Sequence, residues 1–183
     1  MPRVVARDGV ADSVPSKKIY TILSPVPSTP TSPNAVTALV QSPAISVLAI
    51  GYSTGEIHLH NILTDTPLFT LNQRSLAVSS QTKRVASLSF CTDPFVGAEK
   101  STAEGVGGRI LAVGHEDGNV TLWNLEKRRV FGDIRNAHTP SPHGVHVEWL
   151  SGMNVLVTSG ADNSVKVCWF WGLLITHRDA DHD

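Results

Sequence analysis

Short runs of Val, Ile, Leu and Thr, each bounded by Gly, Pro, Asn, Asp or Ser, recur along most of the chain. Such runs are typical of β-strands. The spacing of three to four residues between apolar positions that marks an amphipathic helix is hard to find anywhere. The pattern of apolar and polar positions therefore predicts an all-β protein.

Three segments with this pattern can be superimposed on one another. Their first strands begin at Val36, Val85 and Val145. Each segment offers a strand, a polar turn, a second strand, a tight turn and a third strand. Asn163 follows Gly118 by 45 residues, and Gly118 follows Gly55 by 63 residues, a distance that includes an irregular stretch at residues 93–109. A repeat of about 40 to 45 residues with four strands per unit is typical of a β-propeller blade.

Each segment has residues suited to a two-residue turn between its second and third strands. Such a turn requires positive φ, which glycine adopts freely and asparagine tolerates. The three turns are expected at Thr54-Gly55, Asp117-Gly118 and Asp162-Asn163. Fourth strands are expected at residues 67–71 and 129–134, and residues 17–23 are expected to form the outer strand of a preceding blade.

These elements divide the chain into four parts. The parts are residues 1–35, with an outer strand and a Pro/Ser-rich loop; residues 36–84, one blade; residues 85–144, a second blade with an insertion at 93–109; and residues 145–183, a partial blade whose tail from Cys168 is atypical. Closed propellers have four to eight blades. We therefore expect a fragment of about three four-stranded blades that does not close a ring.

Composition narrows the class of protein. The chain has 183 residues and is 41% hydrophobic, which is enough for a substantial core, and its formal net charge of −1 gives no global field for nucleic acid. The two cysteines are far apart in sequence, so free thiols are expected. The first residues lack the apolar core of a secretory signal, and the longest apolar run, residues 167–175, is about half a membrane-spanning helix. We expect a soluble intracellular protein.

The stretch "DGNVTLWNL", with Asp117, Gly118 and Trp123, resembles the end of a WD40 repeat, and Asn124 stands where the repeat has Asp. In such repeats a His, a Ser or Thr, an Asp and a Trp form a buried hydrogen-bond chain. The resemblance implies three of these places in the last blade for His138, Ser159 and Asp162. At the Trp position that blade has Cys168, and the first blade has His60, which are departures from the pattern.

The combination of "VTALVQSPAISVLAIGYSTGEIHLHNI", "NAH" and "LVTSGADNSVKV" is similar to the amino-terminal propeller of the large tandem-propeller WD40 proteins in the UtpB subcomplex of the small-subunit processome. These proteins act with U-three small nucleolar RNA in early rRNA processing. The resemblance covers residues 17–167 and implies a nuclear, nucleolar scaffold for protein and ribonucleoprotein assembly in small ribosomal subunit biogenesis. It implies protein subunits as partners, weak or indirect contact with pre-rRNA or snoRNA, and no cofactor, small-molecule substrate or membrane.

From Cys168 onward the sequence departs from these relatives, which continue through many more blades. We expect the chain to be a truncated or mis-joined piece of such a protein. Because repeat units rely on their neighbours to bury apolar faces, the chain alone is expected to be marginally stable, aggregation-prone or oligomeric.

Several constellations of residues could carry chemistry. His58 and His60 share one face of a strand, but no third metal ligand is evident, and packing is favoured. The glycine-rich residues 104–109 lead into a strand rather than a helix, so a loop is favoured over a nucleotide site. The Ser, His and Asp of a WD40 blade imitate a catalytic triad while serving as structural links. We therefore predict no enzymatic activity; the alternatives are a WD40 adaptor for ubiquitin ligation or trafficking and, after it, a propeller hydrolase.

Basic residues gather after the third strand of the second blade. The candidate phosphate or partner contacts are Lys127, Arg128, Arg129 and Arg135. A solvated hairpin tip is the simpler interpretation, and contact with phosphate in a ribonucleoprotein is the alternative. Lys17, Lys18, Lys83 and Arg84 are further candidates. No aromatic residues interleave with these groups, as a single-strand stacking platform would require.

Six Ser-Pro or Thr-Pro steps are candidates for proline-directed phosphorylation. Their acceptors are Ser24, Thr29, Ser32, Ser42, Thr139 and Ser141. The favoured interpretation is that proline ends strands and shapes loops at these positions, because turn chemistry alone accounts for the pattern.

Overall fold

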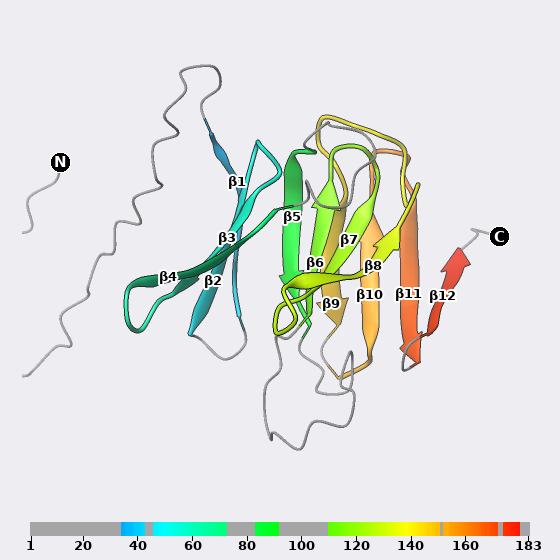
Figure 1. Cartoon of the computed structure of the whole chain (residues 1–183). Helices are drawn as coiled ribbons and strands as arrows, with labels where there is room; N and C mark the ends of the chain where they lie inside the picture. The colour runs from blue at the N-terminus through cyan, green and yellow to red at the C-terminus, as the bar shows by residue number, and fades with distance from the viewer. Residues whose placement is uncertain are drawn as a thin grey trace, which may run out of the picture.

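The computed structural model describes residues 34–42, 46–72, 83–91, 110–150, 152–171 and 174–179, with the backbone alone described for residue 171 and for 174–179 (Figure 1). The strand expected at residues 17–23 and the insertion expected at 93–109 lie outside these ranges. The regular secondary structure of the described ranges consists of β-strands alone, which confirms the all-β prediction. No helix in those ranges has the length and apolar character needed to cross a membrane.

Three antiparallel sheets of four strands each lie side by side, and strand order within each sheet follows the chain (Figure 1). The first sheet contains β1 (Val36–Gln41), β2 (Val47–Tyr52), β3 (Ile57–Asn61) and β4 (Thr66–Leu71). The second contains β5 (Val85–Phe90), β6 (Ile110–His115), β7 (Val120–Asn124) and β8 (Arg129–Ile134). The third contains β9 (His146–Leu150), β10 (Val155–Ser159), β11 (Val165–Trp171) and β12 (Leu174–Asp179). β4 and β8 are the fourth strands predicted from the sequence.

The atypical tail completes the third sheet. β11 runs past Cys168 to Trp171 and pairs with β12, with Lys166 opposite Asp179 and Trp171 opposite Leu174. The tail loses the WD40 motif but keeps short apolar runs, which are sufficient for strand pairing. The third blade, expected to be partial, therefore also has four strands.

The tight turns between second and third strands have the backbone that their residues predict. Gly55 and Gly118 both have φ of 83°, and Asn163 has φ of 60°. A side chain at Gly118 would overlap the carbonyl oxygen of His138 in the next loop. Glycine at this position therefore serves both the backbone conformation and the close approach of the loop.

Two apolar cores lie between the three sheets. Because side chains alternate along a strand, Leu111 and Val113 of β6 face the first sheet, whereas Ile110 and Ala112 face the third. The first core, between the first and second sheets, contains Trp123 of β7. The second core, between the second and third sheets, contains Trp149 of β9, which packs on Phe170 of β11 with ring centroids 4.9 Å apart. Every residue of β6 and β7 is buried. The second sheet is thus covered on both faces.

Hydroxyl groups link the first strands of the second and third sheets, β5 and β9. Ser87 donates a hydrogen bond to the carbonyl of Val145 (2.7 Å) and accepts one from the N–H of Val147 (3.0 Å). Ser89 accepts from the N–H of Trp149 (3.0 Å). These contacts fix β9 against β5, although the two strands belong to different sheets.

The outward faces of the first and third sheets keep exposed apolar side chains. Leu39 of β1 is 62% exposed, and Val165 of β11 is 52% exposed. Both alternate with residues that face the cores, so they point away from the second sheet. The three described sheets therefore form an open stack rather than a closed ring.

Trp123 provides the first test of this packing. It is 3% exposed in the core between the first and second sheets. We expect Trp123→Ala to reduce the free energy of unfolding by about 3–5 kcal/mol, because a large buried ring is replaced by a cavity. Urea titration followed by circular dichroism measures the change. The control is Leu63→Ala, which is 74% exposed and should change stability by less than about 0.5 kcal/mol. Equal effects of the two substitutions would refute the assigned packing.

Candidate functional site

A buried histidine links the second and third sheets. His138 lies in the loop between β8 and β9, and its Nδ1 is 2.9 Å from Oδ1 of Asp162 in the β10–β11 turn. Its Nε2 is 2.9 Å from the hydroxyl of Thr158 in β10. Because an ionised carboxylate only accepts hydrogen bonds, Nδ1–H donates to Asp162, and in the neutral imidazole Nε2 then accepts from the hydroxyl of Thr158. Ser164 also donates its hydroxyl to Asp162 (2.9 Å).

The electrostatics of this link favour an ionised Asp162. Desolvation raises the pKa of this carboxyl, but hydrogen bonds from His138 and Ser164 together outweigh that effect and hold the pKa well below its ordinary value. The carboxylate remains charged at neutral pH and holds the loop that carries His138 to the β10–β11 turn.

The structure corrects one predicted member of this hydrogen-bond chain. Thr158, not Ser159, meets His138. Successive side chains of β10 point to opposite faces, so a shift of one position places Ser159 on the outward face with Val155 and Val157. Cys168, at the Trp position, is 1% exposed in the second core and forms no disulfide, as expected for a packed thiol.

A lysine takes the place of the histidine between the first and second sheets. A Cβ built on Gly55 would contact the carbonyl of Lys83, just as one built on Gly118 would contact the carbonyl of His138. Lys83 and His138 therefore occupy equivalent loop positions. The ammonium of Lys83 forms an ion pair with the carboxylate of Asp117, which corresponds to the contact between His138 and Asp162. This ion pair offsets the charge of Lys83, a predicted phosphate contact.

The second sheet carries its own buried imidazole. His115, at the end of β6, is 0% exposed, and its Nε2 is 3.1 Å from the hydroxyl of Thr121 in β7. Burial, assisted by the positive charge of Lys83 and opposed by the negative charge of Asp117, lowers the pKa of His115 to about 4. His115 is therefore neutral at pH 7.

The histidine pair of the first sheet contacts neighbouring acidic residues. His60 Nε2 lies 3.0 Å from Asp65 Oδ1, and His58 Nε2 lies 3.7 Å from Glu56 Oε2. The ring of His58 also packs on Tyr52, with centroids 4.7 Å apart. Within the described ranges, no group of three or more His, Cys, Asp and Glu residues could hold a metal ion.

Asparagine at the name-giving Asp position shapes the turn that follows the third strand. The side-chain oxygen of Asn124 accepts from the N–H of Lys127 (2.8 Å), and that of Asn61 accepts from the N–H of Leu63 (2.9 Å). A short amide side chain commonly bonds in this way to backbone two or three residues ahead. This contact fixes the tip of the β7–β8 hairpin, where Lys127, Arg128 and Arg129 are exposed.

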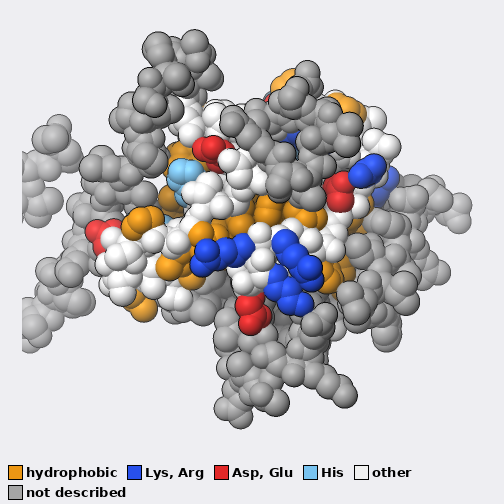
Figure 2. Space-filling model, viewed as in Figure 1, with side chains coloured by type: hydrophobic (Ala, Val, Ile, Leu, Met, Phe, Trp, Pro, Cys, Tyr) orange, Lys and Arg blue, Asp and Glu red, His pale blue; other side chains and the backbone are white. Residues whose placement is uncertain are grey.

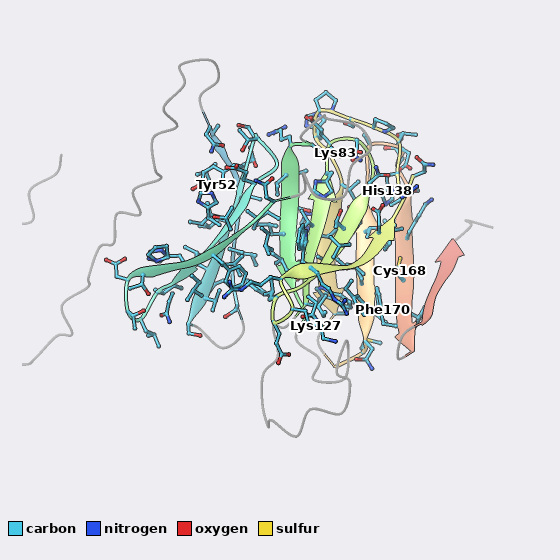
Figure 3. The ribbon with its side chains drawn as sticks, in the orientation of Figure 1. Tyr52, Lys83, Lys127, His138, Cys168 and Phe170 are labelled. Carbon is cyan, nitrogen blue, oxygen red and sulfur yellow. The ribbon has the colours of Figure 1, made fainter. Side chains whose placement is uncertain are left out.

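The basic hairpin tip spans two sheets. The guanidinium carbon of Arg128 lies 4.6 Å from the ring centroid of Phe69 in β4, a cation–π contact. Figure 2 shows Lys and Arg side chains gathered near the middle of this face, bordered by apolar side chains. Figure 3 shows Lys127 toward the opposite end of the sheets from Lys83 and His138. The sequence shows no aromatic residue interleaved here, because Phe69 belongs to the neighbouring blade.

The predicted basic contacts differ in how their charges are satisfied. Arg135 Nε is 3.1 Å from Asp133 Oδ2, and Arg84 Nη1 donates to the carbonyl of Pro142 (2.7 Å). Arg128 and Arg129 have no acidic partner among the residues that the structure describes. Among the described arginines of the predicted surface, these two lack an acidic partner, and both are exposed.

Stacked four-stranded antiparallel sheets joined by such loop-to-turn links define a WD40 β-propeller. Solved propellers share the fold. The WD40 repeats of RRP9 align with a TM-score of 0.55 at 17% identity, over 78% of this chain and 36% of that one. The β-propeller domain of Myceliophteria thermophila Cps50 (Swd1) aligns with a TM-score of 0.56 at 14% identity, over 81% of this chain and 40% of that one.

The chain belongs to the family described as the WDR36/Utp21 first beta-propeller, whose model matches residues 11–170. It is 33% identical over 137 residues to human WD repeat-containing protein 36, covering 75% of this chain and 13% of the relative. It is 32% identical over 133 residues to the Schizosaccharomyces pombe U3 small nucleolar RNA-associated protein 21 homolog, covering 73% and 12%. The chain thus spans about an eighth of the length of these curated relatives. The family predicted from the sequence is confirmed.

The low pKa of His115 predicts a pH-dependent stability. The unfolded chain binds a proton at this residue near pH 6.5, whereas the folded chain binds it only near pH 4. Stability should therefore fall as the pH decreases from about 6.5 to about 4, by roughly 3 kcal/mol in total. Urea unfolding of the wild type and of His115→Gln across this range measures the effect. The variant should have the flatter profile, and parallel profiles would contradict the prediction.

The depressed pKa of Asp162 predicts a second pH window, in which stability is again lost as the pH decreases but at lower pH than for His115. Replacement of this carboxylate in Asp162→Asn should cost about 1–3 kcal/mol at pH 7, because hydrogen bonds to a charged group are lost. The difference should shrink as the pH falls below about 4, where the unfolded carboxyl is protonated. The control is Asp133→Asn, an exposed partner of Arg135, which should cost less than about 1 kcal/mol. Equal losses from both variants at pH 7 would argue against the link.

Proposed function

We propose that this chain is part of a non-catalytic WD40 scaffold for protein and ribonucleoprotein assembly in small ribosomal subunit biogenesis and rRNA processing, acting in the nucleolus. The observation that carries the proposal is the family match over residues 11–170 together with a relative named as U3 small nucleolar RNA-associated. Stacked sheets with exposed loops and outer strands offer several partners separate surfaces. Protein subunits of a large assembly are the expected main partners.

The geometry of the buried polar groups supports a structural role over catalysis. The His138 side chain is 0% exposed, and both of its ring nitrogens are engaged by Asp162 and Thr158. A general base must reach a proton of its substrate. Here the imidazole holds a loop to a turn and is inaccessible to a substrate. The hydrolase alternative therefore gains no support from this constellation.

The basic hairpin tip supports a weak, local RNA contact. Arg128 is held over Phe69, and Arg129 follows it, so one guanidinium is already oriented before binding. With a formal net charge of −1, the chain has no global attraction for nucleic acid, so such binding must be local. Two phosphate contacts with single-stranded RNA give a slope of log affinity against log salt of about −1.4.

Recovery of RNA with the tagged chain tests the scaffold proposal. We expect U3 small nucleolar RNA, pre-ribosomal RNA and other proteins of the assembly to be enriched over unrelated nuclear RNA, and the chain to localise to the nucleolus. Sequencing of the bound RNA and mass spectrometry of the bound proteins give the readout. Recovery of a cullin adaptor or of vesicle coat proteins in their place would support the alternative WD40 adaptor.

The arginine pair is tested separately with the purified chain. Arg128→Ala combined with Arg129→Ala should weaken binding of a single-stranded RNA oligonucleotide and make the salt slope shallower by about 1.4. The matched control is Arg135→Ala, which removes an exposed arginine already bound to Asp133 and should leave the slope unchanged. An unchanged slope in the double variant would place any RNA contact elsewhere, without affecting the scaffold proposal.

A further inference from the structure

The Ser-Pro and Thr-Pro acceptors that the structure describes differ in access. Ser42 is 5% exposed, and its hydroxyl accepts from the N–H of Val47 (3.3 Å). Ser141 is half-buried, and its hydroxyl accepts from the N–H of His143 (3.2 Å). Thr139 is exposed, and its hydroxyl has no hydrogen-bond partner within the described ranges. Of these three acceptors, Thr139 alone presents an accessible hydroxyl that is not already used.

The backbone around Thr139 is anchored on both sides. The N–H of His138 donates to the carbonyl of Gly118 (3.0 Å), and that of Ser141 donates to the carbonyl of Glu116 (2.9 Å). Between these anchors, Thr139 and Pro140 are exposed and form neither a strand nor a turn. Proline has no N–H to be satisfied, so this dipeptide can bind in a kinase cleft without the loss of a backbone hydrogen bond at Pro140.

We propose that Thr139 is a phosphorylation site for a proline-directed protein kinase. The threonine hydroxyl oxygen attacks the γ-phosphorus of ATP, a new O–P bond forms, and the bond between the γ-phosphorus and the ADP oxygen breaks. The hydroxyl proton passes to the general base of the kinase. The products are phosphothreonine and ADP.

The modification changes the charge at the loop end of the sheets. At this end Lys83 pairs with Asp117, and the side chain of Arg84 and the backbone of Glu116 contact the loop that carries Thr139. The ionised Asp162, which is bonded to His138, is a further negative charge there. A phosphate adds about −1.5 to −2 charges. This end therefore becomes more acidic, whereas the hairpin tip with Lys127, toward the opposite end, stays basic (Figure 3). Phosphorylation weakens polyanion binding at the loop end and favours basic partners there.

Site-resolved phosphorylation of the folded chain tests the proposal. The kinase is a proline-directed kinase chosen because it phosphorylates both Thr139 and Ser141 in an unstructured peptide of residues 135–146. In the folded chain, mass spectrometry should show Thr139 phosphorylated about tenfold faster than Ser141, because freeing Ser141 breaks hydrogen bonds to backbone. Ser141 is thus a matched control in the same loop with the same motif.

Two variants complete the test. Thr139→Ser should keep the modification at position 139, and Thr139→Ala should abolish it without a change in the melting curve. After kinase treatment, the wild type should elute from heparin at lower salt than treated Thr139→Ala. Equal rates at Thr139 and Ser141 in the folded chain, or modification of the peptide but of neither residue in the folded chain, would overturn the site. Identical elution would overturn its electrostatic consequence.

Discussion

The second sheet packs against a neighbouring sheet on each of its two faces, and this packing decides where the first and third sheets lie. A sheet whose side chains alternate between two apolar faces is stable only when each face is covered. Here the first and third sheets provide that cover, and every residue of β6 and β7 is buried as a result. The same rule leaves Leu39 and Val165 exposed on the outward faces, because no described sheet lies beyond them.

Apolar faces alone would let the sheets slide, and polar links fix their position. The two links use different chemistry for the same geometry. The imidazole of His138 has two nitrogens and meets two partners, Asp162 and Thr158. Lys83 forms an ion pair with the carboxylate of Asp117. Thr158 lies four residues before Asp162. The equivalent residue, four before Asp117, is Val113, which is apolar and fully buried. The link made by His138 thus includes a threonine hydroxyl, which bonds to the second ring nitrogen. The link made by Lys83 has a valine at that position, because an ammonium group has no second ring nitrogen to satisfy.

The residue two positions before the aspartate also differs between the two links. Gly160, two residues before Asp162, is required because a Cβ there would lie 2.5 Å from Cβ of His138 and 2.6 Å from Cγ of its ring. His115 stands at the equivalent place, two residues before Asp117, and fills that position with its own buried imidazole. An imidazole is therefore supplied from the loop at one interface and from the strand at the other.

Much of this architecture could be predicted because it is local in sequence. Strand positions follow from short apolar runs, and the turns at Gly55 and Gly118 follow from the need for positive φ. The prediction that Ser159 bonds to His138 was wrong, because Thr158 takes that place. The choice between these adjacent residues depends on which face of β10 meets the loop of His138, and the register of the strand decides that face. The contact between Arg128 and Phe69 joins residues of different blades, and no local pattern encodes it.

The distribution of charge follows from this packing rather than from composition. The positive charges of Lys83 and Arg135 are offset by Asp117 and Asp133, so they serve the fold before they can serve a partner. Arg128 instead lies against an aromatic ring, which orients the guanidinium without neutralising it. The basic surface of this nearly neutral chain therefore lies where arginines lack a carboxylate partner among the described residues, as Arg128 and Arg129 do. Among the described residues, that surface lies where the β7–β8 hairpin tip contacts β4 of the first sheet.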